Sequence, residues 1–327
     1  MIVSCAPFRV SFVGGGSDIP SFYLKHGGAV LSCTIAKYSF AVIHSYLDGD
    51  KYNIKYALTE TVDTVEEIRH PLFRECVKML NVEPGIEINS IADIRSGTGL
   101  GSSSSFCVAL LNGLHAYQRR FVEKTKLAEQ ACEVEIDRLR EPVGRQDQYA
   151  AAWGGLNFIE FSKNGAVSVQ PLLLDKEIIS ELENGLMLFY SGIQRDAGPI
   201  LDKQTTAINN DGGKIEMLKQ MVENTYALRN TLTDGDLRGF GQSLHANWLL
   251  KRSLTAEISS PHIDRLYDKA IKNGALGGKL AGAGGGGFFV FYCPPEKQPN
   301  LRKALSELTE VEFKFDWTGA RIILAEL

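Results

Sequence analysis

Runs of β-branched and aromatic residues, separated by polar or glycine-containing segments, predict strands along the first half of this chain. The expected strands are Ile2–Val13, Ala29–Ile35, Ser39–Tyr46, Tyr52–Leu58, Ile86–Ile91, Leu156–Phe161 and Val167–Leu173. Apolar residues at helical spacing predict helices at Thr64–Leu80, Phe106–Tyr117 and Lys126–Leu139. Pro142 is suited to the first turn of a further helix, because proline lacks an N–H that the first turn would leave unpaired.

The second half alternates between the two kinds of pattern, which predicts an α+β fold. The expected strands are Leu186–Tyr190, Gly286–Tyr292, Val311–Phe315 and Arg321–Ala325, and the expected helices are Lys214–Leu232, Asp236–Leu250, His262–Asn273 and Glu296–Leu308. The polar stretch Lys203–Lys214 predicts a mobile loop. A shift in composition near Leu174–Asn184 predicts two domains, residues 1–178 and 179–327.

The segment Ser96–Ser105 combines three glycines with five serines and leads at once into the apolar run Phe106–Leu114. Glycine allows tight turns that expose backbone N–H groups. A helix that begins there adds unpaired N–H groups and the positive end of its dipole. The composition therefore predicts a loop that binds the phosphates of a nucleotide.

Two familiar phosphate-binding loops do not fit this segment. A P-loop requires a lysine after its last glycine, and none follows Gly101. A Rossmann fingerprint requires a glycine where Ser102 stands. It also requires an acidic residue about 20 positions later at a strand end, and no such residue is present. A flexible linker is disfavoured because the segment joins an apolar amphipathic helix without a polar buffer.

Two other glycine clusters accompany the loop. Gly14–Gly16 follows a strand that contains Arg9, and Ser17 and Asp18 come next. Taken alone, this cluster is equally typical of a hairpin with Asp18 as a turn or cap residue. Gly282–Gly287 precedes the strand Phe288–Tyr292, where glycines permit a close approach of the backbone to a ligand or another loop.

Composition and charge narrow the possible functions. The 327 residues are 44% hydrophobic and 23% charged, and the net charge of −4 with no basic runs argues against nucleic acid as the main partner. We see no apolar run long enough for a membrane span and no signal peptide. Six scattered cysteines without a Cys-x-x-Cys pair indicate free thiols and a cytoplasmic protein. No Gly-x-Ser-x-Gly elbow is present, so a nucleophilic triad is disfavoured.

Together, the three clusters resemble the superfamily of galactokinase, homoserine kinase, mevalonate kinase and phosphomevalonate kinase (GHMP kinases), whose motifs occur in this order along the chain. The resemblance implies a ribosomal-S5-like N-terminal domain, a ferredoxin-like C-terminal domain and an ATP- and Mg²⁺-dependent kinase site between them. The first motif departs from galactokinase, because Phe8 replaces a glycine. The forms of Gly14–Asp18 and Val143–Gly155 are similar to the branch that phosphorylates the anomeric hydroxyl of D-glycero-D-manno-heptose 7-phosphate to the 1,7-bisphosphate, a step toward nucleotide-activated heptose.

The resemblance also implies roles for individual residues. Asp147 would act as the catalytic base with Arg9 beside it, and Ser103 and Glu135 would hold the metal, although Glu129, Glu133 and Asp137 are neighbouring acidic alternatives. The nucleotide would be bound by Ser96, Gly97, Gly99, Leu100, Gly101, Ser102, Ser103 and Ser104. The substrate would be bound by Gly15, Gly16, Ser17, Asp18, Tyr149, Lys251, Lys279, Gly284 and Gly285, with the lysines serving an anionic sugar phosphate.

Other readings remain open at this point. The acceptor could be another sugar, such as fucose or an N-acetylhexosamine, or an isoprenoid precursor. A non-catalytic sensor of sugar and nucleotide is a different class, which the joint presence of Arg9, Ser103 and Asp147 disfavours. The expected partners are ATP and a sugar phosphate, without nucleic acid or membrane, and a homodimer is compatible with the sequence.

Overall fold

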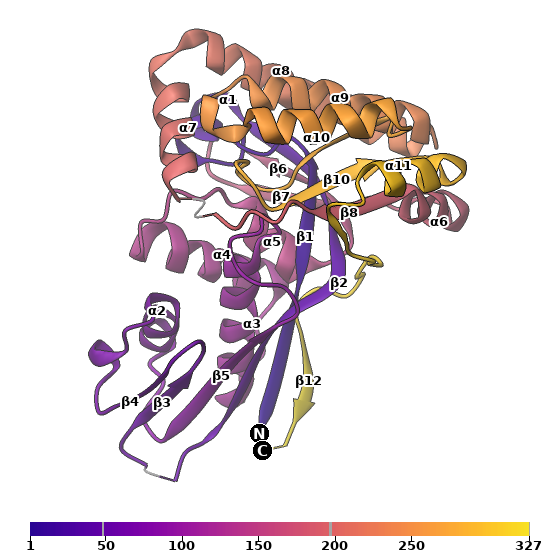
Figure 1. Cartoon of the computed structure of the whole chain (residues 1–327). Helices are drawn as coiled ribbons and strands as arrows, with labels where there is room; N and C mark the ends of the chain where they lie inside the picture. The colour runs from indigo at the N-terminus through magenta and orange to yellow at the C-terminus, as the bar shows by residue number, and fades with distance from the viewer. Residues whose placement is uncertain (48, 196–197, 327) are drawn as a thin grey trace.

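The computed structural model describes residues 1–47, 49–195 and 198–326, which form two stacked parts (Figure 1). The first part is built on an eight-stranded sheet in the order β12-β1-β2-β5-β3-β4, with β6 paired to β2 and to β7. Neighbouring strands are antiparallel except for the pair β3 and β5. The strands are β1 (Ile2–Val13), β2 (Gly28–Ser45), β3 (Tyr52–Lys55), β4 (Thr59–Val62), β5 (Ile86–Ala92), β6 (Leu156–Phe161), β7 (Val167–Pro171) and β12 (Arg321–Ala325).

Strand β2 replaces two predicted strands with a single one of 18 residues. Its pairing with β1 shifts register between Pro7 and Phe8, so the chain continues through an irregularity where the sequence suggested a break. The first half of β2 pairs with β6 and the second half with β5. One long strand therefore connects the top of the sheet to its base.

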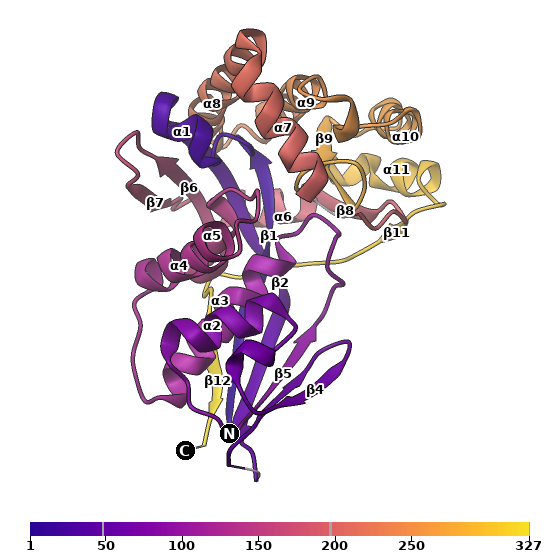
Figure 2. The same ribbon diagram turned by 90° about the vertical axis from the view of Figure 1, so that its left-hand side faces the viewer.

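Helices α2 (Pro71–Leu80), α3 (Ser102–Tyr117), α4 (Lys124–Cys132) and α5 (Gln146–Trp153) cover one face of this sheet (Figures 1 and 2). Helix α3 is central, and its Phe106, Leu110 and Leu114 are buried against the sheet. A π-helical turn at Glu133–Arg138 continues α4, and a 3₁₀ turn at Val65–Glu67 precedes α2. The predicted helix at Thr64–Leu80 is thus divided before Pro71, because the residue before a proline disfavours helical backbone.

The second part has a four-stranded antiparallel sheet in the order β11-β8-β10-β9. Its strands are β8 (Leu186–Tyr190), β9 (Gly277–Leu280), β10 (Phe288–Tyr292) and β11 (Thr309–Glu310). Its helices are α6 (Lys176–Gly185), α7 (Gly198–Asn210), α8 (Gly212–Thr233), α9 (Leu237–Arg252), α10 (Pro261–Lys272) and α11 (Gln298–Ala304), with 3₁₀ turns at Ala256–Ile258 and Pro295–Lys297. Helix α1 (Pro20–His26) of the first part contacts α7.

A shared hydrophobic core joins the two parts. Phe12 of β1 and Phe240 of α9 meet edge to face with ring centroids 5.2 Å apart, and both side chains are fully buried. The same cluster contains Leu188 of β8 and Val290 of β10. Apolar side chains from both sheets pack into one cluster, and this cluster holds the two parts together near the end of β1.

Several sequence-based expectations are corrected by the structure. Lys203–Lys214 is not a loop: α7 and α8 meet within it, and the side chain of Asp211 caps α8 by accepting from Gly213 N at 2.8 Å. Val311–Phe315 is not a strand, although Phe315 forms a bridge with Ile35. Helices α1 and α6 and strands β4 and β9 were not expected.

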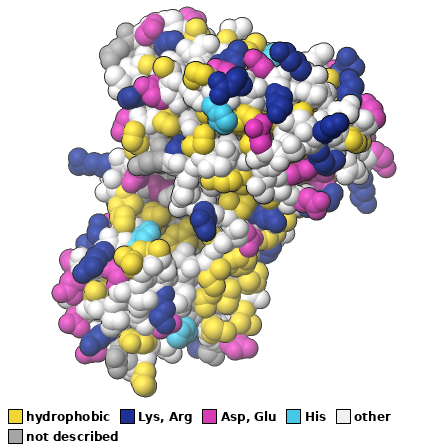
Figure 3. Space-filling model, in the orientation of Figure 1, with side chains coloured by type: hydrophobic (Ala, Val, Ile, Leu, Met, Phe, Trp, Pro, Cys, Tyr) yellow, Lys and Arg dark blue, Asp and Glu magenta, His cyan; other side chains and the backbone are white. Residues whose placement is uncertain are grey.

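The last strand also changes the predicted division of the chain. β12 pairs with β1, so the end of the chain returns to the first sheet instead of staying with residues 179–320. Among the described residues, no helix is long and apolar enough to cross a membrane. On the face drawn in Figure 3, lysine and arginine side chains are interspersed with aspartate and glutamate.

Candidate active site

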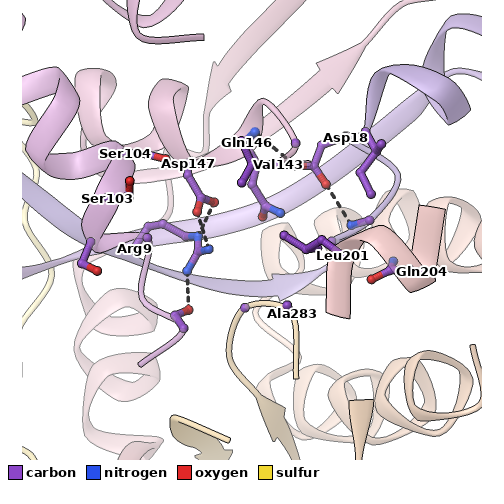
Figure 4. A pocket seen from close by; sticks show the side chains of 18 of the residues that line it. Arg9, Asp18, Ser103, Ser104, Val143, Gln146, Asp147, Leu201, Gln204 and Ala283 are labelled. Carbon is purple, nitrogen blue, oxygen red and sulfur yellow. Dashed lines mark hydrogen bonds and ion pairs between the residues drawn. The ribbon is translucent and has the colours of Figure 1, made fainter. Parts of the chain in front are cut away.

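A cleft where the two parts meet brings together most of the predicted site residues (Figure 4). Those that line it are Arg9, Gly15, Gly16, Asp18, Gly97, Gly99, Gly101, Ser102, Ser103, Ser104, Glu135, Asp147 and Lys251. They come from β1 and the segment after it, the loop before α3 and the first turn of α3, the π-helical turn, the start of α5 and the end of α9. The fold thus gathers into one cleft residues that lie up to 242 positions apart in sequence (251 − 9).

The glycine-serine loop has the backbone that its sequence predicts. Gly97, Gly99 and Gly101 have φ angles of 77°, 87° and 73°, in the left-handed region that glycine adopts without strain. Helix α3 begins immediately afterwards at Ser102. The loop therefore presents the N–H end of a long helix to the cleft, which suits it to bind an anionic phosphate.

The third glycine cluster packs against this loop. A Cβ atom on Gly99 would lie 2.4 Å from the Ala281 carbonyl oxygen, and one on Gly287 would lie 2.2 Å from the Thr98 carbonyl oxygen. The Phe288 N–H donates to the same Thr98 oxygen at 3.1 Å. These glycines are needed because two backbone segments approach too closely to leave room for side chains.

Arg9 and Asp147 form a bidentate ion pair beside the loop. Arg9 Nε donates to Asp147 Oδ1 at 2.7 Å and Nη2 donates to Oδ2 at 2.6 Å, while Nη1 donates to the Gly99 carbonyl at 2.7 Å. Arg9 is 4% exposed, whereas the Asp147 side chain is 21% exposed toward the cleft. The buried guanidinium holds the carboxylate at a fixed position between the loop and the rest of the cleft.

Ser103 and Glu135 form a small oxygen cluster at the start of α3. Ser103 Oγ donates to Glu135 Oε1 at 2.9 Å, and Gln148 Nε2 donates to Oε2 at 2.6 Å. Burial raises the pKa of Glu135 to about 7, although hydrogen bonds from Ser104, Gln148 and Ser103 oppose the shift. A buried carboxylate next to a hydroxyl fits Mg²⁺, which prefers oxygen ligands and keeps several waters. Within the described residues, no three His, Cys, Asp or Glu side chains gather as a complete protein metal site.

Asp18 lies on the other side of the cleft from this cluster. Its Oδ1 accepts from Gly16 N at 2.8 Å and its Oδ2 from Gln146 N at 3.2 Å, and the residue is 2% exposed. A Cβ on Gly144 would lie 1.8 Å from Asp18 Oδ2, so only glycine allows this close approach. Burial raises the pKa of Asp18, and the nearby Asp147 carboxylate adds to that shift.

Two buried lysines contribute positive charge near Asp18. Lys251 Nζ donates to the Gly282 carbonyl at 2.6 Å, and burial lowers its pKa to about 8. Lys279 Nζ has no hydrogen-bond partner among the described residues, and burial, followed by the Lys251 charge, lowers its pKa well below the usual value. Lys279 lies on the same face of β9 as Gly277, which touches the Gly241 carbonyl of α9, so its side chain points toward that helix.

Seven predicted site residues do not line the cleft, and one of them is Lys279, which is 1% exposed behind it. Tyr149 is 2% exposed in the core between sheet and helices, because its helix turns that side chain away from the cleft. Ser17 is bound to the backbone of Ala29, and Leu100 is buried in the shared core. The Ser96 carbonyl accepts from Gln194 Nε2, and Gly284 and Gly285 pack against Ile258.

Other lining residues were missed or not assigned from the sequence. Gly282 and Ala283 line the cleft in place of the next two glycines of the same cluster. Gly144 and Gln146 lie within the segment Val143–Gly155 and line the cleft beside Asp18. Nothing in the sequence predicted that this segment lies next to Asp18. Leu201 and Gln204 lie on α7, which the sequence suggested was a loop, although their spacing of three is helical.

Comparison with known proteins agrees with the motifs. The family model of the GHMP kinases N terminal domain matches residues 64–155, and that of the GHMP kinases C terminal matches residues 221–310. The chain is 31% identical over 312 residues to the D-glycero-alpha-D-manno-heptose 7-phosphate kinase of Campylobacter jejuni, with 91% of each covered. It is 26% identical to the bifunctional fucokinase/GDP-fucose pyrophosphorylase of Arabidopsis thaliana, covering 95% of this chain but 32% of that protein.

A solved structure gives the same result for the whole fold. The crystal structure of a D-glycero-D-manno-heptose 1-phosphate kinase from Bacteriodes thetaiotaomicron has a TM-score of 0.82 and 25% identity, with 100% of both chains covered. The α+β fold and the kinase activity predicted from the sequence are thereby confirmed. The chain belongs to the GHMP kinase family and is a sugar kinase, a phosphotransferase that uses ATP and an alcohol acceptor.

Proposed function

We propose that this kinase transfers the γ-phosphoryl group of ATP to the anomeric hydroxyl of D-glycero-D-manno-heptose 7-phosphate and forms the 1,7-bisphosphate. The observation that carries the proposal is the position of Asp147. This carboxylate is fixed by Arg9 between the glycine-serine loop and the side of the cleft that contains Asp18. We call the group Asp18, Gln204, Lys251 and Lys279 the acceptor side.

In this proposal Asp147 acts on the acceptor hydroxyl. In the proposed reaction its carboxylate accepts the hydroxyl proton, while the acceptor oxygen bonds to the γ-phosphorus and the bond to the bridging oxygen of ADP breaks. Arg9 holds that carboxylate in a bidentate ion pair and adds positive charge next to the transferred group. The N–H groups at the start of α3 bind phosphate oxygens.

Mg²⁺ would be held by Ser103 and Glu135 together with phosphate oxygens and water. When bound, it neutralises charge on the phosphates of ATP. In the protein alone, Ser103 donates to Glu135 and keeps both oxygens together at the cleft. The carboxylate and the hydroxyl are thus preorganised by α3 and the π-helical turn.

An anionic acceptor is supported by the lysines of the acceptor side. Burial lowers the pKa of both Lys251 and Lys279; Arg9 and Arg195 lower that of Lys251 further, and Lys251 lowers that of Lys279. A bound anion would relieve this repulsion between positive charges. The name of the Campylobacter relative specifies a heptose 7-phosphate, and that of the Bacteriodes structure specifies a heptose 1-phosphate. The two names leave the position of the existing phosphate to experiment.

A neutral sugar is the second candidate acceptor. The relatives include fucokinase domains, of which the Arabidopsis example aligns with nearly all of this chain. In this alternative the lysines bind the phosphates of the nucleotide instead of a phosphate on the acceptor. The contact of Lys251 with Gly282, which lies next to the loop glycine Gly99, is compatible with that role.

The test is ADP release from ATP and Mg²⁺ with a panel of acceptors. The panel contains heptose 7-phosphate, heptose 1-phosphate, heptose, L-fucose and N-acetylhexosamines, and ³¹P NMR of the product locates the new phosphate. We expect the highest kcat/KM with heptose 7-phosphate and a new signal at the anomeric position. Preference for a neutral sugar or for heptose 1-phosphate would overturn the assignment of the acceptor.

A further inference from the structure

Helix α7 presents one side of its first turns to the cleft. Leu201 and Gln204 are three residues apart, lie on the same side of the helix and both line the cleft (Figure 4). Gln204 is 1% exposed, and its Nε2 has no hydrogen-bond partner among the described residues. The helix thus brings a buried amide donor into the cleft.

The amide of Gln204 lies beside the turn that contains Asp18. A Cβ atom on Gly16 would be 2.4 Å from Gln204 Nε2, so the two groups are in contact. The Gly16 N–H is already used by Asp18 Oδ1. Across the same turn, Gln146 donates its backbone N–H to Asp18 Oδ2, while its side-chain Oε1 is buried without a partner among the described residues.

The three side chains offer complementary hydrogen-bonding groups. Gln204 has a free donor, Gln146 has a free acceptor, and each Asp18 oxygen has a lone pair beyond the one that its backbone N–H occupies. A sugar hydroxyl both donates and accepts, so it can bind between a donor and an acceptor of this set. An apolar ligand would leave the Gln204 donor and the Gln146 acceptor buried and unpaired.

Gln204 is poorly explained as a purely structural residue. Buried amides in a core are almost always hydrogen-bonded, because an unpaired donor costs folding free energy. The packing of α7 is provided by apolar residues such as Ile208, which is 2% exposed in the cluster of the second part. A polar group kept at such a position is typical of a site whose partner is a ligand.

We propose that Gln204 is a specificity-determining residue that donates its Nε2 hydrogen to a hydroxyl of the acceptor sugar beside Asp18. The proposal rests on the function given above, since it requires a sugar to occupy the acceptor side. In this proposal, α7 of the second part contacts the acceptor sugar directly. Gln204 takes no part in proton transfer, which Asp147 performs.

The test compares Gln204→Met with Thr206→Ala in the full chain. Methionine has a similar length and shape without a donor, and Thr206 is an exposed residue on the same helix. For Gln204→Met we expect KM for heptose 7-phosphate to rise about tenfold, as for the loss of one hydrogen bond, with KM for ATP unchanged. The thermal unfolding midpoint should stay the same or increase, because an unpaired donor has been removed. Thr206→Ala should match the wild type.

Monodeoxy analogues of heptose 7-phosphate identify the hydroxyl. The analogue that lacks the hydroxyl bound by Gln204 should have the same KM with wild type and Gln204→Met, while the other analogues keep the tenfold difference. A lower unfolding midpoint with an unchanged acceptor KM would overturn the assignment of Gln204 alone. If the wild type phosphorylates no sugar or sugar phosphate, the proposed function fails, and this inference fails with it.

Discussion

In the glycine-serine loop, neighbouring backbone segments touch and hydrogen-bond one another, whereas two of the four side chains of the acceptor side are buried without a hydrogen-bond partner among the described residues. Gly99 and Gly287 allow the loop and the third glycine cluster to meet, and the Thr98 carbonyl accepts from Phe288. Across the cleft, Lys279 Nζ and Gln204 Nε2 have no partner among the described residues. The first region is fixed before any ligand binds, because its contacts are within the protein. The unpaired polar groups of the acceptor side lower the stability of the folded protein, but they are free to form hydrogen bonds or ion pairs with a ligand.

The largest expected effect comes from the residue between the two regions. Asp147→Asn keeps the size of the side chain and a hydrogen bond to Arg9, but it removes the carboxylate that we propose accepts the hydroxyl proton. We expect kcat to fall by about 10²–10⁴-fold, the range for loss of a general base. ADP release gives the rate, and nucleotide binding, measured separately, should be retained. A rate within a few-fold of the wild type would remove Asp147 from the role of base.

A methyl group in the loop tests whether backbone contact fixes it. Gly99→Ala places a Cβ 2.4 Å from the Ala281 carbonyl oxygen at a residue with φ of 87°. We expect a loss of about 1–3 kcal/mol in the free energy of unfolding and a higher KM for ATP, because the loop must shift. The control is Gly212→Ala, where a Cβ meets open space and no such loss is expected. Equal behaviour of the two variants would show that the close contact is unimportant.

Removing a buried charge from the acceptor side should have the opposite effect on stability. Lys279→Met deletes an ammonium group without a partner in the described chain. The unfolding midpoint should be unchanged or higher, while KM for a sugar monophosphate rises about tenfold through loss of a charge interaction. KM for the corresponding neutral sugar should not change. A destabilised variant with wild-type KM for the sugar phosphate would indicate that Lys279 serves the fold.

The smallest effect is a pH dependence from Lys251. Burial lowers the pKa of this lysine from 10.5 to about 8, so the folded protein loses the proton near pH 8 while the unfolded chain keeps it to about 10.5. Between these values the unfolded state binds more protons, so the contribution of Lys251 to stability rises with pH and is lost as pH falls through 8. KM for an anionic acceptor should increase above pH 8, as the charge disappears. This increase should be absent in Lys251→Met, and its persistence there would assign it to another group.

Short-range patterns predicted the parts of the site that depend on local backbone geometry. The order of glycines and serines at Ser96–Ser105 predicted a phosphate loop followed by a helix, and α3 begins at Ser102. The pairing of Arg9 with Asp147 was expected from the family resemblance and is present as a bidentate ion pair. Glu135, with three acidic neighbours in sequence, is the one that meets Ser103, because the π-helical turn directs it inward.

Patterns failed where distant packing decides the environment of a side chain. The polar composition of Lys203–Lys214 suggested a loop, but burial of Ile208 makes the segment helical and carries Gln204 to the cleft. Tyr149 is two residues from Asp147, yet its side chain is in the core, since neighbouring positions on a helix face different directions. β12 looked like a strand of the second part until its pairing with β1 was known.

By itself, the sequence determined the family, the kinase chemistry and the backbone of the glycine-serine loop, since each depends on motifs in which neighbouring residues set the backbone conformation. Only the tertiary structure decided which side chains share the acceptor side. Asp18 lies in the segment between β1 and α1, and Gln204, Lys251 and Lys279 come from α7, α9 and β9, so no local spacing relates them. Their pairing, their burial and the shifts in their pKa values arise from packing between the two parts, so they exist only in the folded chain.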